Sequence, residues 1–272
     1  TGEVGATGEA GASGEAGNTG ETGPVGETGA TGAGVECINN NLVAGSNVIL
    51  VDQFNTIYGC QAGENNPIGS RNTFIGFQAG QNTGNTGASV LGYQAGQNAQ
   101  GDNAIAIGNQ SGQNNQGDGA ISMGYHAGFW AQGFQAIAIG ELAGFTGQGM
   151  CGVAVGCEAG LEGQSDDSIA IGDMAGQYLQ GYNIGNKGEL IPIGSIAIGP
   201  EAGRYNQEGN AIAMGKQAGE TGQDRNAIAI GVQAGTFEQS LNAIAIGMSA
   251  GRTGQSNDSV AIGSFAGEEQ QH

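Results

Sequence analysis

The chain has 272 residues, of which 57 are glycine, while only 11% are charged and 6% aromatic, a composition that argues against a globular core of large side chains. With 25 acidic and 6 basic residues, the formal net charge is −19, so nucleic acid and anionic membrane surfaces are unfavourable partners. No apolar run approaches the roughly 20 residues that a membrane-spanning helix needs, and we predict no membrane insertion by this segment.

The first 34 residues carry glycine at every third position. Eleven unbroken triplets extend from Gly2 to Gly34, starting with GEV-GAT-GEA. This period is typical of the collagen triple helix, in which three chains wind about an axis where only glycine fits. We therefore predict a collagen-like triple-helical stalk over residues 1–34. Because the stalk has a single proline, Pro24, and its glutamates have no basic partners, we expect the next domain to hold the three chains together.

The remainder of the chain is dominated by a short repeat. Residues 35–58 are apolar and irregular, and we interpret them as a neck or N-terminal cap. From residue 59 onward the phrase apolar-Gly-x-x-Ala-Gly occurs thirteen times, once with Ser for Ala, at a spacing of sixteen except for 17 at the first step and 27 between Gly172 and Gly199. Sixteen residues are too few for a helix pair but suit one coil of a β-solenoid. The predicted fold over residues 59–272 is an all-β, parallel β-solenoid of thirteen coils, with a hairpin insertion near residues 180–193.

Each position of the repeat has a predicted place in the coil. In Ala104-Ile105-Ala106-Ile107 the isoleucines share one face of a strand and the alanines the other. Each coil is so small that one face is expected to take branched side chains and the other only methyl groups. The paired glycines are expected at a tight corner where a Cβ would clash or φ must be positive, with the intervening alanine buried. The second variable position is expected to form an amide ladder along the stack, in which His126 is a substitute; its glutamines are Gln61, Gln78, Gln94, Gln110, Gln217 and Gln233.

A coil this thin buries little surface, so one face of its strands needs a partner. Three solenoids packed about a common axis would supply it, and the collagen period independently requires three chains. Both arguments predict a homotrimer.

The NAIAIGxxAG phrase resembles the head repeats of YadA-like trimeric autotransporter adhesins, whose motif is NSVAIGxxS. The resemblance covers about residues 42–272. It implies a left-handed parallel β-roll, trimeric and on the cell surface, that binds host or matrix components. Together with the collagen triplets, the AIAIGxxAG form is also similar to collagen-like surface fibre proteins of bacteria and giant viruses.

Two functions follow as hypotheses. The first is a structural subunit of an extracellular or surface fibre or filament, homotrimeric and assembling head-to-tail. The reason is that the sequence stops at residues 264–272, just after the thirteenth repeat, with no capping sequence. A cap removed during maturation, or lying outside this sequence, is the alternative to head-to-tail assembly. The second function is a trimeric surface adhesin that binds host, matrix or neighbouring-cell components. The predicted location is extracellular, on a cell or virion surface, and the predicted main partner is the chain itself.

Enzymatic activity is not expected. The histidines are His126 and His272, and no Ser-His-Asp or Cys-His set can be assembled around them. No cofactor is predicted. A structural calcium ion is a weaker alternative, because aspartates precede several strands, where Asx turns are also expected; they are Asp102, Asp118, Asp166, Asp167 and Asp258.

Two further groups of residues are candidates for contacts. Phe129, Trp130 and Phe134 are close in sequence, and Tyr182 and Lys187 lie in the predicted hairpin, so these five form a possible contact patch. The four cysteines, which match no zinc spacing, are candidates for interchain disulfides, with buried free thiols as the alternative; they are Cys37, Cys60, Cys151 and Cys157. Cys60 and Cys157 occupy the same coil position about six coils apart, too far to pair within one chain.

Overall fold

The computed structural model describes residues 36–38, 41–44, 54–65, 69–184 and 190–269. The chain divides into two compact units, residues 1–34 and 35–272. The predicted collagen-like stalk lies outside the described residues and stays a prediction.

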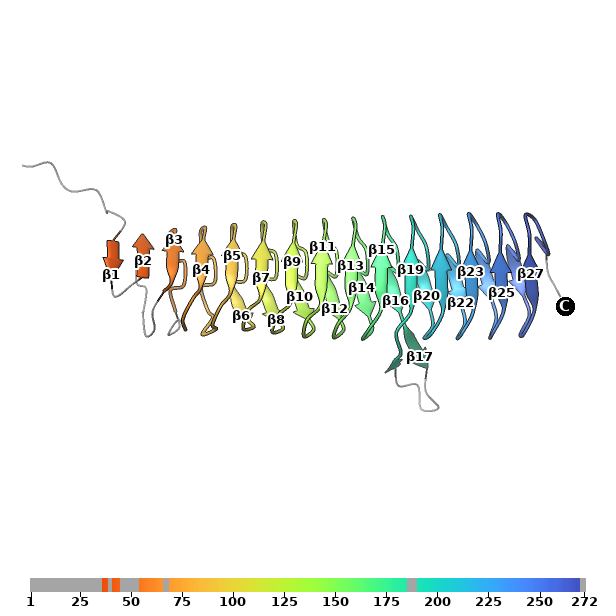
Figure 1. Cartoon of the computed structure of the whole chain (residues 1–272), viewed down its shortest axis with the longest axis horizontal. Helices are drawn as coiled ribbons and strands as arrows, with labels where there is room; N and C mark the ends of the chain where they lie inside the picture. The colour runs from red at the N-terminus through yellow and green to blue at the C-terminus, as the bar shows by residue number, and fades with distance from the viewer. Residues whose placement is uncertain (1–35, 39–40, 45–53, 66–68, 185–189, 270–272) are drawn as a thin grey trace, which may run out of the picture. The chain divides into compact units, whose positions relative to one another are not determined.

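The described part of the second unit is all-β, with strands of three or four residues arranged in two long sheets (Figure 1). The larger sheet receives one strand from each of the thirteen repeats: β3 (Thr56–Tyr58), β4 (Thr73–Ile75), β5 (Ser89–Leu91), β7 (Ile105–Ile107), β9 (Ile121–Met123), β11 (Ile137–Ile139), β13 (Val153–Val155), β15 (Ile169–Ile171), β19 (Ile196–Ile198), β21 (Ile212–Met214), β23 (Ile228–Ile230), β25 (Ile244–Ile246) and β27 (Val260–Ile262). Its remaining strands are β1 (Glu36–Ile38) and β2 (Asn41–Ala44), which pair antiparallel, and β2 pairs parallel with β3.

The second sheet has ten strands, one for each coil from β6 onward. They are β6 (Asn98–Gln100), β8 (Asn114–Gln116), β10 (Trp130–Gln132), β12 (Thr146–Gln148), β14 (Glu162–Gln164), β16 (Tyr178–Gln180), β20 (Tyr205–Gln207), β22 (Thr221–Gln223), β24 (Phe237–Gln239) and β26 (Thr253–Gln255).

The pairing is parallel and in register from coil to coil. Ile137 of β11 lies between Ile121 of β9 and Val153 of β13, its equivalents one repeat earlier and one repeat later. The same register continues through both sheets as far as the described residues extend. The predicted parallel β-solenoid is therefore confirmed.

The glycine corners form for the predicted reason. Gly140 ends a strand of the larger sheet with a φ of +132°, and a Cβ there would lie 2.3 Å from the carbonyl oxygen of Gly156 in the next coil. Gly144 closes the same corner with a φ of +52°, in the left-handed region that glycine adopts most easily. Ala143, between them, is fully buried. The first glycines thus form a column in which successive backbones approach too closely for any side chain.

The interior consists mainly of alanine methyl groups. The middle residue of each strand in the larger sheet points inward, and Ala106, Ala138 and Ala154 are fully buried there. The isoleucines on either side of them point outward, as predicted. Two short strands separated by such small side chains leave little room for any larger apolar group.

A buried glutamine ladder fills the rest of the interior, and this ladder was not predicted. Gln223 is fully buried, and its Nε2 donates to the carbonyl oxygens of Ile212 (2.9 Å) and Ala227 (3.2 Å) and to Gln239 Oε1 (3.0 Å). Its own Oε1 accepts from Gln207 Nε2 at 3.0 Å. The side chain therefore braces the second sheet against the larger one. The ladder contains Gln100, Gln116, Gln132, Gln148, Gln164, Gln180, Gln207, Gln223, Gln239 and Gln255.

In the first coils, larger apolar side chains occupy the inward position that alanine holds in most later coils. The inward positions of β3, β4 and β5 hold Ile57, Phe74 and Val90, all nearly inaccessible to solvent. The prediction that only methyl groups fit inside is wrong for these coils. The physical reason is visible for Phe74, because Gly84 replaces the ladder glutamine in the same coil and leaves space for a ring.

A hairpin interrupts the stack at the long spacing between Gly172 and Gly199. β17 (Tyr182–Ile184) pairs antiparallel with β18 (Leu190–Pro192), where a hairpin was predicted, and Figure 1 shows this pair projecting from the coils. The stack itself is not disturbed, because Ile169 of β15 still pairs with Ile196 of β19.

Candidate interaction surfaces

An aliphatic face covers the outer side of the larger sheet. From β7 to β27 the first and third residue of every strand is Ile, Val or Met, and we call these two columns the aliphatic face. Ile139, Ile171 and Ile230 remain 37–38% exposed in the single chain. A continuous apolar surface of this kind is typical of a protein–protein interface.

The predicted outer amide ladder is present at the corner of the coil. Gln94 Nε2 donates to Gln78 Oε1 at 2.7 Å, and Gln110 Nε2 donates to Gln94 Oε1 at 3.1 Å. His126 takes the next position, with its Nε2 2.6 Å from Gln110 Oε1. Burial lowers the pKa of His126, which favours the neutral imidazole. Because Gln110 faces His126 with its oxygen, Nε2 carries the proton, and the histidine continues the ladder as predicted.

Two further amide columns lie beside this ladder and were not predicted. Gln97 Nε2 donates to Gln78 Oε1 (3.1 Å) and to Gln81 Oε1 (3.0 Å), so neighbouring columns are bonded to each other. Gln113 repeats this arrangement one coil later. A parallel asparagine column consists of Asn65, Asn82, Asn98 and Asn114. Their common spacing of sixteen or seventeen residues was the available sequence signal.

In the next coils along the stack, aromatic rings take the positions that amide side chains hold in these columns. The His126 ring stacks on Tyr125 at 3.9 Å between centroids and contacts Phe129 at 4.8 Å. Phe129 stacks on Phe145 at 5.2 Å and meets Trp130 edge-on at 5.6 Å. The amides and rings together form what we call the amide–aromatic strip: Gln78, Gln81, Asn82, Gln94, Gln97, Asn98, Gln110, Gln113, Asn114, Tyr125, His126, Phe129, Trp130 and Phe145.

The predicted contact patch is only partly assembled. Phe129 and Trp130 lie together, as expected. Phe134, although exposed, belongs to the opposite turn of the coil, in the column that holds Asp118 and Met150, and so does not join them. Tyr182 lies on the hairpin strand β17, where burial, and to a lesser extent Asp166, raises the pKa of its hydroxyl. Lys187 lies outside the described residues.

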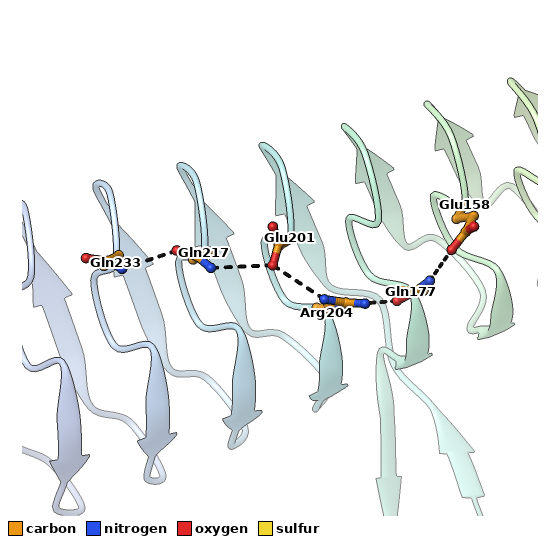
Figure 2. Close-up of polar contacts among 6 residues, drawn as sticks. All are labelled: Glu158, Gln177, Glu201, Arg204, Gln217 and Gln233. Atoms are coloured by element: carbon orange, nitrogen blue, oxygen red, sulfur yellow. Dashed lines mark hydrogen bonds and ion pairs between the residues drawn. The ribbon is translucent and has the colours of Figure 1, made fainter.

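Further along the stack the same corner carries charge. Figure 2 shows a run of polar contacts through Glu158, Gln177, Arg204, Glu201, Gln217 and Gln233. Arg204 Nε donates to Gln177 Oε1 at 2.8 Å, and its guanidinium lies 4.8 Å from the centroid of the Tyr205 ring, which stacks on Tyr178. These contacts join the coils on either side of the hairpin insertion.

The aspartates at the other turn bind backbone groups of the neighbouring coil. Asp118 Oδ1 accepts from the backbone N–H of Asp102, and Asp102 Oδ1 accepts from that of Thr86, each one coil earlier. At these two positions the bonds take the place of the local Asx turns that were expected, whereas Asp258 Oδ1 accepts from the side chain of Asn242. Within the described ranges, no group of three or more His, Cys, Asp or Glu side chains is placed to hold a metal ion.

Three cysteines are exposed free thiols: Cys60, Cys151 and Cys157. Burial, followed by the charges of Glu158, Asp173 and Glu141, raises the pKa of the Cys157 thiol. Cys37 belongs to β1, and the predicted interchain pairing stays a prediction.

Comparison with known families agrees with this architecture. Residues 85–111 match the model of the YadA head domain repeat, in two copies. No curated protein and no solved structure gives a significant match to the chain. In the part of the chain that the structure describes, no helix has the length and hydropathy needed to cross a membrane. The matched segment contains β5, β6, β7 and two stacked corner glycines. Residues 85–111 are therefore similar to YadA head repeats, and coils of the same kind recur through β27.

Proposed function

We propose that this chain forms the head of a homotrimeric surface adhesin, displayed on a cell or virion surface. The aliphatic face is the observation that carries the proposal, because a single solenoid leaves two columns of branched side chains exposed to water. Packing three copies about one axis removes this surface from water, at a gain of roughly 25 cal/mol for each Å² buried. The match to YadA head repeats and the glycine period of residues 1–34 both support three chains.

Substitution of Ile139 and Ile171 by aspartate is expected to abolish the trimer. Unpaired carboxylates at the centre of an apolar interface cost several kcal/mol each, and a trimer carries three copies of both. Light scattering of the unmodified chain should give three times 26.9 kDa, and the double variant should give the mass of one chain.

Leu179 provides the matched control. It is 42% exposed but lies on β16 of the second sheet, so Leu179→Asp should leave the trimer intact. A monomeric unmodified chain would contradict the proposal. Equal dissociation by the control variant would show that the aliphatic face is not the interface.

A structural filament subunit is the second candidate function, and the collagen-like glycine period of residues 1–34 favours it. Electron microscopy of material from the native source separates the two functions. An adhesin head is expected to appear as isolated projections, whereas head-to-tail assembly is expected to give continuous filaments with a regular axial repeat. Filaments that persist after deletion of residues 1–34 would show that the stalk is not the connector.

A further inference from the structure

The amide–aromatic strip contains no Asp, Glu, Lys or Arg, although the chain carries a net charge of −19. Glutamates mark its two ends: Gln81 Nε2 donates to Glu64, and Glu141 takes the position of Tyr125 in the coil of Phe145. The columns of the strip carry no ionised group in the coils between them. Its histidine favours the neutral form, because burial lowers the pKa of His126. A surface of this composition is suited to a neutral partner.

The ladders leave hydrogen-bonding capacity unused. An amide has two N–H donors and two acceptor lone pairs. Gln110 uses one donor toward Gln94 and one lone pair toward His126, and therefore keeps one of each. Gln94 keeps one N–H and Gln97 keeps one lone pair. These three side chains are partly exposed, so unused donors and acceptors are both available in two successive coils, about 4.8 Å apart.

The rings at the end of the strip are held by one another. His126 lies between the ring of Tyr125 and that of Phe129, and Phe145 extends the stack by another coil. Tyr125 and Trp130 are 49% and 46% exposed. Because Phe129 and Phe145 lie face to face, Tyr125 and Trp130 supply the exposed aromatic surface, and such rings attract polarised C–H groups.

We propose that the amide–aromatic strip binds a neutral polysaccharide chain. Hydroxyl groups both donate and accept, as the unused amide groups require, and the C–H faces of sugar rings pack on aromatic faces. A periodic polymer also suits a surface that repeats from coil to coil. This inference rests on the proposed surface location and gives the adhesin a class of ligand.

Other occupants fit less well. Added β-strands need free backbone groups, but the strip's backbone is already paired between coils, as in the bonds from Gly112 N to Ala127 O and from Asn114 N to Phe129 O. Anionic polymers are repelled by the net charge of the chain. A second copy of this chain is the remaining occupant, and the experiment below tests for it.

The full chain is titrated by calorimetry with chitohexaose, cellohexaose and dextran, with dextran sulfate as the anionic comparison. At least one neutral glycan is expected to bind. The double variant Tyr125→Asn/Trp130→Asn should weaken that binding about tenfold or more through loss of both exposed rings. Asparagine preserves the fold here, because Asn109 and Asn114 hold the equivalent positions one coil earlier.

Phe134→Gln is the matched control, since it removes an exposed ring from the same coil but at the opposite turn, and it should bind like the unmodified chain. The inference is overturned if no neutral glycan binds, if only dextran sulfate binds, or if the control loses as much affinity as the double variant. It is also overturned if the double variant has the mass of one chain and the unmodified chain binds no glycan, because the strip would then be an interface between copies.

The outcomes also separate this inference from the proposed function. If the unmodified chain is a trimer but binds no glycan, only this inference fails. If it is a monomer that binds a glycan, only the proposed trimer fails.

Discussion

Replacement of Gly140 by alanine is expected to lower the free energy of unfolding of the solenoid by about 3 kcal/mol or more. A φ of +132° is strained for any L-residue with a side chain, at roughly 1–3 kcal/mol. In addition, the new Cβ would lie 2.3 Å from the carbonyl oxygen of Gly156, so the two coils must move apart. Denaturant unfolding followed by circular dichroism measures the loss.

Gly147→Ala is the matched control, seven residues away in the next strand. A Cβ at Gly147 would meet nothing within 4 Å, and Ala99 and Ala131 already adopt the same left-handed conformation at the equivalent position of other coils. Its expected cost is therefore only that of the left-handed backbone conformation, about 1–2 kcal/mol. Equal destabilisation by both substitutions would show that backbone conformation, and not the contact between coils, determines the glycine column.

Replacement of Gln223 by leucine is expected to cost about 2–4 kcal/mol. The volume is nearly conserved, but Gln239 Oε1 loses its donor inside the core. Gln207 Nε2 also loses one bond but keeps those to the carbonyl oxygens of Ile196 and Ala211. Each buried polar group left unsatisfied costs about 1–3 kcal/mol. The same unfolding measurement applies.

Gln233→Leu provides the comparison on the outer ladder. Gln233 donates to Gln217 at 3.2 Å on a partly exposed corner, and Leu142 occupies the same position elsewhere with the same backbone conformation. This change should cost less than about 1 kcal/mol, since water can replace the lost bond. If Gln223→Leu is as mild as Gln233→Leu, the buried ladder does not stabilise the fold.

The structure of the coil could be predicted because it follows from residue preferences and spacings within a single repeat. A strand of alternating Ile and Ala shows which face is inside, and a glycine at a fixed spacing marks a corner that excludes Cβ. The outer ladder was also predictable, because Gln78, Gln94 and Gln110 recur at the same position beside a corner.

The buried ladder escaped prediction although Gln207, Gln223 and Gln239 recur with the same regularity. Glutamine in a polar stretch is ordinarily exposed, and its burial here depends on carbonyl groups that only the facing sheet supplies. The composition of the aromatic cluster was not predicted correctly, for a related reason. Phe134 is close to Phe129 in sequence but lies on the other turn, whereas Phe145, sixteen residues away, stacks on Phe129 directly.

The near-identity of successive coils has an evolutionary consequence. Removing residues 212–227 would join Ala211 to Ile228, restore the phrase Ala-Ile-Ala-Ile and place Gln207 against Gln239. Every contact across the junction would have a counterpart already present elsewhere in the stack. Unequal recombination within such a gene can therefore add or delete whole coils without a new core being designed. The length of the solenoid becomes a heritable property that varies in steps of about 4.8 Å.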